Sequence, residues 1–223
     1  MQRLRELSTL FLADKEFSGA SGLQVTDAMA VAIAAQACLP VLELGLGCYG
    51  RFVGIVVHPD PVAARRETMD EIGVVHRFTE ELSGEAMDGG PLMLAWSDVA
   101  EAGESAAWGY NVVIHEFVHV LDLHAARAGM PPGGGGASWA RRLADEHTRF
   151  VERVEAGEDT LLDPYGAEAI EEFLAVAAEA FFVASGELKD EEPRLYGLLV
   201  DFFRQDPEAD ARRCCNEQGT AKR

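Results

Sequence analysis

This sequence is poor in basic residues relative to acidic ones, and it lacks long apolar segments. Its 223 residues include 19 Lys and Arg against 38 Asp and Glu, a formal net charge of −19. A surface of this sign repels phosphate backbones and anionic lipid, and no basic stripe offsets it, so we expect neither direct nucleic-acid binding nor membrane attachment. The nearly uncharged run 28–42 is shorter than the roughly 20 residues of a membrane span and is interrupted by Pro40.

Cysteine is also scarce, and its placement argues against both a zinc ribbon and a disulfide framework. The four cysteines are Cys38, Cys48, Cys214 and Cys215, without the spacing of a zinc ribbon. The first residues, MQRLRELSTLFLADKEF, carry acids among the apolar positions, which is typical of neither a signal peptide nor a transit peptide. We therefore expect a protein of the reducing cytoplasm.

The pattern of apolar residues predicts helices first, strands next and helices again. Helices are expected over 2–17 and from a cap at Thr26 to near Pro40, and strands over 51–58, 73–79 and 92–96. Further helices are expected over 110–127, from a cap at Ser138, over 168–185 and from about 193, with a flexible connector at 131–136 and a turn at 163–166. This order favours an α+β fold, mostly helical, with a small mixed sheet beside helix 110–127.

Helix 110–127 contains a pattern that is typical of a metal site. The segment NVVIHEFVHVLD includes His115-Glu116-x-x-His119. Residues four apart share one face of a helix, so both imidazoles can reach one ion. Glu116 lies about 100° around the helix from His115, where it can take a proton from a metal-bound water. The alternative is a helix with two ordinary, water-exposed histidines. The apolar neighbours disfavour it, because they indicate a buried helix, and buried imidazoles are costly unless they have partners such as a metal ion.

A zinc ion held by two histidines needs a third protein ligand and one open position. His124, five residues after the second histidine, is rotated by about 140° and poorly placed to ligate. A glutamate from the apolar helix 168–185 is therefore the favoured ligand. Glu172 and Glu179 lie seven residues apart on one face of that helix and both remain candidates, whereas Glu171 is expected to face water.

Three segments of the sequence together are more specific than the metal motif alone. They read KEFSGASGLQVTDAMAVAIAAQACLPVLELGL, NVVIHEFVHVLD and DPYGAEAIEEFLAVAAEAFF. From about Leu4 to Pro207 the sequence resembles the Mlc titration factor A family of cytoplasmic bacterial zinc peptidases. The catalytic domain of that family is similar to that of lethal-factor type proteases, so the resemblance implies a zincin-like fold.

The resemblance also implies which residues form the site. In both groups of proteases the third zinc ligand is a glutamate seven residues after an active-site tyrosine, and Tyr165 plus seven is Glu172. The implied ligands of one Zn²⁺ per chain are thus His115, His119 and Glu172. Glu116 is implied as the general base and Tyr165 as an electrophilic helper, although the residues alone favour a buried turn tyrosine at position 165.

Two departures from the family pattern stand out. Val118 is bulkier than the small residue expected inside the motif, and the glycine-rich connector 131–136 follows the metal helix closely, where it can alter substrate access.

Asp122 and Glu179 are each read either as hydrogen-bond partners of the ligand imidazoles or as ordinary surface acids.

Two functions of different classes are consistent with this sequence. The first is a zinc peptidase, of the aminopeptidase type that the family resembles, acting on a peptide or protein substrate. The second is a regulatory binding protein, since some family members sequester a glucose-responsive transcriptional repressor, and zinc would then be incidental. A metal hydrolase for a non-peptide amide is a third reading. Strand 92–96 is expected either as an exposed edge that aligns substrate or as an interior strand.

The expected organisation is one zincin-like domain over residues 1–206. Its N-terminal helices lie in 1–50, the sheet in 51–100 and the zinc-binding helices in 108–206, and residues 207–223 form a flexible tail.

Overall fold

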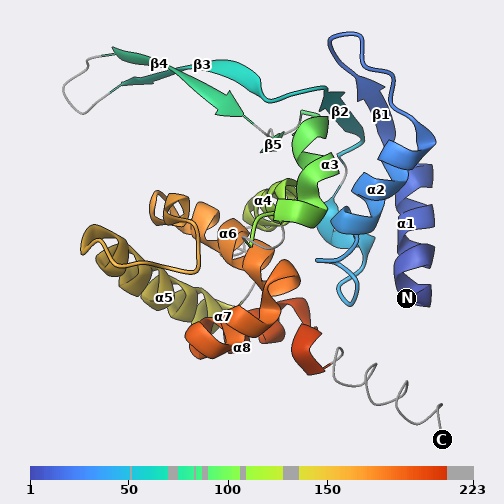
Figure 1. The fold of residues 1–223 in the computed structure, drawn as a ribbon. Helices are drawn as coiled ribbons and strands as arrows, with labels where there is room; N and C mark the ends of the chain where they lie inside the picture. Colours follow the sequence, from blue (N-terminus) through green and yellow to red (C-terminus); the bar gives the residue numbers. More distant parts are fainter. Residues whose placement is uncertain are drawn as a thin grey trace, which may run out of the picture.

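Helix α4 (Val112–Arg127), which carries the metal motif, lies between the strands and the C-terminal helices (Figure 1). The computed structural model describes residues 1–50, 52–69, 75–82, 84–86, 90–105, 109–127 and 136–209. Around α4 are α1 (Gln2–Asp14), α2 (Asp27–Ala37), α3 (Trp96–Ser105), α5 (Ala137–Glu155), α6 (Ile170–Val183), α7 (Ser185–Glu191), α8 (Pro193–Phe203) and the 3-10 turns η1 (Leu46–Tyr49) and η4 (Pro164–Ala167). The α+β prediction, mostly helical with a small mixed sheet beside the motif helix, is confirmed.

The sheet has the order β1 (Glu16–Gly19), β2 (Gly54–His58), β6 (Leu92–Ala95), β5 (Gly84–Ala86). The first three strands are parallel, and β5 pairs antiparallel with β6 in the register Gly84↔Leu94. Strand β6 is therefore an interior strand. The expectation that 92–96 forms an exposed edge is wrong, because β5 covers that edge and takes its place beside α4.

Strands β3 (Val62–Met69) and β4 (Val75–Leu82) form a separate antiparallel hairpin that extends away from the helices (Figure 1). The prediction of a strand at 73–79 corresponds to β4, and its first two residues lie outside the described part of the chain. Strands β3 and β5 and helices α3 and α7 were not predicted; β5 and α7 are short, and α3 follows β6 without an intervening residue.

The first helix ends three residues earlier than predicted. After Asp14 the backbone is extended at Lys15, and Glu16–Gly19 pairs with β2 instead of continuing the helix. The Lys15 ammonium donates to the Phe52 carbonyl at 2.7 Å and to Asp14. Tertiary pairing with β2 thus overrides a helical apolar period that runs on to residue 17.

The start of α5 also differs from the prediction. The helix begins at Ala137 with Gly136 as its N-cap, so Ser138 lies inside the helix and does not cap it. The other predicted elements correspond to β2, α2, α4, α6 and α8 within a few residues, and the predicted turn at 163–166 is the capped 3-10 turn η4.

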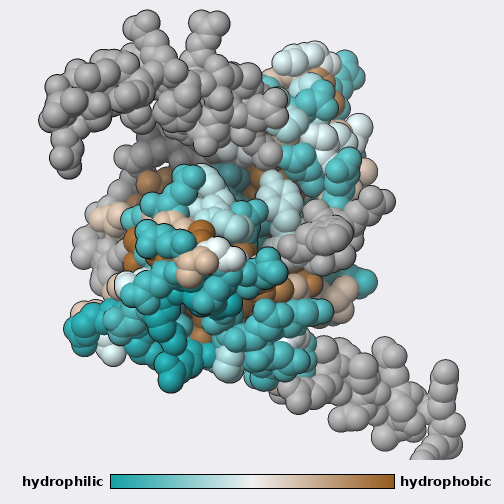
Figure 2. Space-filling view, turned by 60° about the vertical axis from the view of Figure 1, so that its left-hand side comes forward, coloured by the Kyte–Doolittle hydropathy of each residue, from teal (hydrophilic) through white to brown (hydrophobic). Residues whose placement is uncertain are grey.

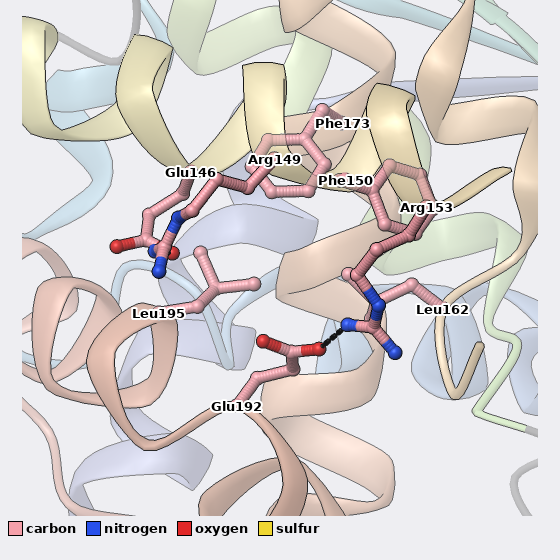
Figure 3. A pocket seen from close by; sticks show the side chains of 8 residues that line it. All are labelled: Glu146, Arg149, Phe150, Arg153, Leu162, Phe173, Glu192 and Leu195. Carbon is pink, nitrogen blue, oxygen red and sulfur yellow. Dashed lines mark hydrogen bonds and ion pairs between the residues drawn. The ribbon is translucent and has the colours of Figure 1, made fainter. Parts of the chain in front are cut away.

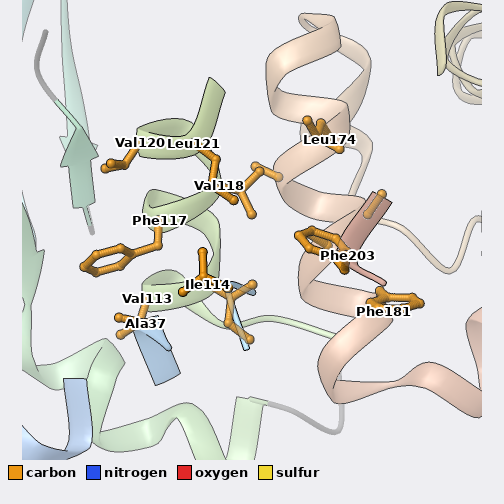
Figure 4. Close-up of a cluster of buried hydrophobic side chains, with 14 of the residues drawn as sticks. Ala37, Val113, Ile114, Phe117, Val118, Val120, Leu121, Leu174, Phe181 and Phe203 are labelled. Atoms are coloured by element: carbon orange, nitrogen blue, oxygen red, sulfur yellow. The ribbon is translucent and has the colours of Figure 1, made fainter. Parts of the chain in front are cut away.

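The core gathers around α4 and α6, and apolar side chains of α4 point both toward α6 and away from it (Figure 4). Phe117 points away from α6 and packs edge-on against Phe11, Tyr49 and Phe52. Val118 is fully buried on the side of α4 that faces α6, so its extra bulk fills core space and lines no cleft. A rigid pair of helices therefore supports whatever polar groups they carry.

The surface agrees with the acidic composition, because hydrophilic residues dominate the described face in Figure 2. In the part of the chain that the structure describes, no helix is both long and apolar enough to cross a membrane. Cys38 and Cys48 are free thiols, while Cys214 and Cys215 lie outside the described residues. Residues 207–209, the start of the expected tail, are attached to α7 and α8 through hydrogen bonds of Glu208.

Candidate metal centre

Three side chains from two helices meet at one point between α4 and α6. Glu172 Oε2 lies 3.1 Å from His115 Nε2 and 3.2 Å from His119 Nε2, and the two Nε2 atoms are 3.1 Å apart. The edge of a tetrahedron around zinc, with bonds of about 2.05 Å, is about 3.3 Å. The three atoms thus form a triangle of the size that a tetrahedral zinc site requires.

The fit of these residues to a metal rests on their chemistry as well as on their spacing. Two imidazole nitrogens and one carboxylate oxygen are the donors that zinc takes in catalytic sites with an open fourth position. Among the described residues, His115, His119 and Glu172 are the group of three whose ligand atoms could share one ion. The sequence prediction of this set as neighbours is borne out in space, while its role as a ligand set remains a proposal.

Asn111 fixes the N-terminus of the motif helix and was missed by sequence reasoning. Its side-chain Oδ1 accepts from the Ile114 amide at 3.0 Å, which is the geometry of an N-cap. Its Nδ2 donates to Gln36 Oε1 on α2 at 2.8 Å. An asparagine directly before the apolar run of a helix is a recognised start signal and could have identified it.

Glu179 joins this N-terminus to the first histidine. Its Oε1 lies 2.7 Å from His115 Nδ1, and its Oε2 accepts from the Asn111 amide. Only 2% of Glu179 is exposed, so the reading of this residue as a surface acid is wrong. The bond to Nδ1 fixes the orientation of the His115 ring with Nε2 toward Glu172.

Glu116 is held in an unusual environment for a carboxylate. It is 6% exposed, and its Oε2 has no hydrogen-bond partner among the described residues. Strand β5 passes directly against it, because a Cβ atom on Gly84 would lie 2.4 Å from Glu116 Cγ and 2.5 Å from Oε1. Glycine at position 84 therefore leaves the space that the carboxylate occupies, a requirement that no sequence pattern revealed.

Tyr165 stands at the mouth of the cluster. It lies on η4, which Asp163 caps by accepting from the Tyr165 amide at 2.9 Å, and which leads directly into α6. Its ring centroid is 6.3 Å from that of His115, and 40% of the residue is exposed. The alternative of a buried turn tyrosine is thus wrong.

The cluster perturbs the protonation of its own members. Burial raises the pKa of Glu116 to about 7, against the opposing charges of His115 and His119. Burial would lower the pKa of His115, but hydrogen bonds to Glu172 and Glu179 outweigh it and raise that pKa to about 10. Burial opposes the shift of Glu172, yet its bonds to the two histidines lower its pKa to about 2. Shifts of this size, in groups that surround one point, are typical of functional sites.

The structure also shows the positions of two residues that the sequence analysis had set aside as ligands. His124 lies against Gly50, where a Cβ would come 2.5 Å from its Nδ1, so it is turned away from the cluster as expected. Glu171 is exposed, also as expected. The role of Asp122 stays a prediction, and the connector 131–135 lies outside the described residues.

A partly buried histidine pair, a carboxylate partner and an adjacent buried glutamate, one of whose oxygens has no partner among the described residues, are typical of a metallopeptidase centre. The chain belongs to the family of glucose-regulated metallopeptidases M90, which matches residues 1–204. Membership of this family implies a metal, and the His115–His119–Glu172 group is where the described residues could bind it.

Similar proteins point to the same family. A protein named Mlc titration factor A from Pectobacterium atrosepticum is 35% identical over 212 residues, covering 92% of this chain and 79% of that protein. Another of that name from Edwardsiella ictaluri is 34% identical over 212 residues, covering 92% and 80%. An uncharacterised protein from Synechocystis sp. is 36% identical over 211 residues, covering 92% and 77%. The resemblance to the Mlc titration factor A family is thereby confirmed.

Proposed function

We propose that this protein is a zinc-dependent peptidase whose ligands are His115, His119 and Glu172. The observation that carries the proposal is the triangle of two Nε2 atoms and one carboxylate oxygen, with sides of 3.1 to 3.2 Å, beside a buried glutamate. Zinc in such a site supplies a Lewis acid and lowers the pKa of a bound water to about 7.

Glu116 acts as the general base in this proposal. Its Oε2 has no partner among the described side chains and so is available to accept a proton from the attacking water. Burial holds its pKa near 7, which suits a group that takes a proton and then returns it to the leaving amine. The Tyr165 phenol, at the mouth, donates a hydrogen bond to the carbonyl oxygen as negative charge develops there.

Strand β5 replaces β6 as the element that aligns the substrate. It is the last strand of the sheet, and its backbone at Gly84 lies against Glu116. An extended peptide that pairs with the outer edge of β5 would run past the catalytic glutamate and present its carbonyl there. We further propose a preference for the amino end of peptides and a cytoplasmic location, as the sequence led us to expect.

The decisive experiment combines metal analysis with a peptidase assay. Purified protein should hold about one zinc per chain and cleave amino-acyl reporter substrates. The Glu116→Gln variant should keep its zinc and lose turnover, because the change removes the base and leaves the three ligands. Full activity in that variant would refute the proposed mechanism.

A second candidate function follows from the names of the relatives. Proteins called Mlc titration factor A share about a third of their residues with this chain over most of its length. We therefore keep the alternative that this chain binds a transcriptional repressor and that zinc is incidental to that role. Pull-down of a candidate repressor with wild-type and His115→Ala proteins separates the two functions, since undiminished capture by the variant would show binding without the metal.

A further inference from the structure

A cavity lies on the side of α6 that faces α5, away from the metal centre. Its volume is about 140 Å³, and it opens between α5, α6 and the junction of α7 with α8 (Figure 3). Four buried apolar side chains form its interior, namely Phe150, Leu162, Phe173 and Leu195. An apolar cavity of roughly 150 Å³ admits a benzene ring, so this one has room for an aromatic or branched aliphatic group.

The rim of this cavity carries both signs of charge in equal number. Arg149 and Glu146, three residues apart on α5, form one ion pair, and Arg153 forms another with Glu192 across the cavity. The two guanidinium groups lie on opposite sides of the opening in Figure 3. Such a rim offers cationic donors to a carboxylate and anionic acceptors to an ammonium group, in a chain whose overall charge of −19 otherwise repels anions.

The two arginines differ in how firmly they are held. Arg153 contacts Glu158 at 3.1 Å as well as Glu192, and so joins α5 to the α7–α8 junction. Arg149 has a partner within its own helix and is nearly half exposed. The side chain of Glu146 is only 14% exposed, so it must keep a cationic partner. An amino acid supplies one, because its ammonium group can pair with Glu146 while its carboxylate pairs with Arg149.

The cavity is also connected to the turn that carries Tyr165. A Cβ atom on Gly166 would lie 3.4 Å from Phe150 Cε1 and 3.4 Å from Phe173 Cα. Two residues that line the cavity therefore also pack directly against η4. Leu162 lies one residue before Asp163, the cap of that turn. A group that fills the cavity therefore contacts residues that pack against η4 and determine its position.

We propose that this cavity binds a free amino acid with an aromatic or branched aliphatic side chain. The side chain occupies the apolar interior beside the packed rings of Phe150 and Phe173, the carboxylate pairs with Arg149 and the ammonium group faces the rim glutamates. Occupancy restrains η4. The binding itself does not depend on the proposed peptidase activity, whereas any effect on turnover through Tyr165 rests on it.

Calorimetric titration with L-phenylalanine tests the proposal. We expect saturable binding of one molecule per chain to the wild type and equally to His115→Ala, which lacks a complete metal centre. Arg149→Gln should bind roughly 10-fold more weakly or worse, because a hydrogen-bonded charge pair is lost. The matched control is Arg142→Gln on the same helix, whose pair with Asp201 lies outside the cavity, and it should bind like the wild type.

Analogues and hydrogen exchange complete the test. Phenylalanine amide and N-acetylphenylalanine, which each lack one charge, should both bind more weakly than the free amino acid, and bound L-phenylalanine should slow amide exchange in 162–167. Absence of saturation in the wild type would overturn the proposal. So would binding that survives in Arg149→Gln but disappears in His115→Ala, since the amino acid would then occupy the metal centre.

Discussion

The two sides of helix α6 hold charged groups in opposite ways. On the side of α4, the carboxylates of Glu116 and Glu179 and the two histidines are withdrawn from water, and one oxygen of Glu116 has no partner among the described residues. On the side of α5, the Arg149–Glu146 and Arg153–Glu192 pairs are partly exposed and satisfy one another. Charges arranged for stability neutralise each other near water, whereas those of the metal centre are kept apart from it and incompletely paired.

The sharpest test of this contrast is the loss of the unpartnered carboxylate. Glu116→Gln should lower kcat by roughly 10²- to 10⁴-fold, the usual contribution of a general base. Zinc content, measured by metal analysis of the same preparation, should be unchanged because the ligand triangle is intact. A variant that lost zinc and activity together would show that Glu116 supports the site and does not act in it.

The close approach of β5 is the next test. Gly84→Ala places a methyl group where Glu116 Cγ and Oε1 now lie, so the carboxylate must shift. A displacement of about 1 Å in a catalytic group can cost roughly 10²-fold in activity, with zinc retained. Gly197→Ala, at a glycine with no atom within 4 Å of the added carbon, is the control and should have normal turnover. Equal activity of the two variants would contradict the proposal that Glu116, in its position beside Gly84, is the general base.

The hydrogen bond from Glu179 should be measurable as metal affinity. Glu179→Gln removes the charge that orients His115, and loss of such a partner typically weakens metal binding 10- to 100-fold. Competition with a chelator measures the change. Glu171→Gln, on the exposed face of the same helix, should leave the zinc dissociation constant unaltered. A similar loss in both variants would point to net charge and not to the hydrogen bond.

Acid should destabilise the metal-free protein through Glu172. The pKa of this carboxyl is lowered in the folded state to about 2 from an ordinary value of 4.5. Its contribution to stability is therefore complete above pH 4.5 and is lost as the pH falls through about 2. Urea unfolding of metal-free protein at several pH values should show a weaker dependence in this range for Glu172→Gln than for the wild type. Identical slopes would contradict the proposed bonds to the histidines.

The smallest effect is expected on the other side of α6. Arg153→Gln breaks an ion pair that is partly exposed to water, so the free energy of unfolding should fall by less than about 1 kcal/mol. Urea denaturation, with Glu192→Gln and the double variant to complete a cycle, measures the coupling. A coupling of several kcal/mol would show that this side of the helix is as strongly organised as the metal centre.

Sequence reasoning reached most of the helices and the identity of the clustered residues. The four-residue spacing of His115 and His119 and the apolar period of 168–185 are local features, and the helical repeat alone determines which side chains share a face. The choice of Glu172 over Glu179 needed the family resemblance. In the structure both glutamates contact His115, Glu172 at Nε2 and Glu179 at Nδ1. Both candidates that the sequence offered therefore belong to the cluster.

What local patterns missed depends on contacts between distant segments. Strand β1 formed where a helix was expected, β5 covered the edge predicted for 92–96, and Asn111 reached both Gln36 and Glu179. The boundaries of the expected domain and tail remain predictions. None of these pairings leaves a periodic signal, because each is decided by the partner that happens to lie opposite.

The sequence by itself determined a helix with two histidines on one face, a second helix with two acids on one face and an acidic composition, since period and composition are properties of the chain. Only the tertiary structure decided that Glu116 lies under Gly84 without a partner among the described residues and that Glu179 orients His115. The physical reason is that burial and hydrogen bonding belong to pairs of segments far apart in the chain, and those pairs exist only once the core around α4 and α6 has closed.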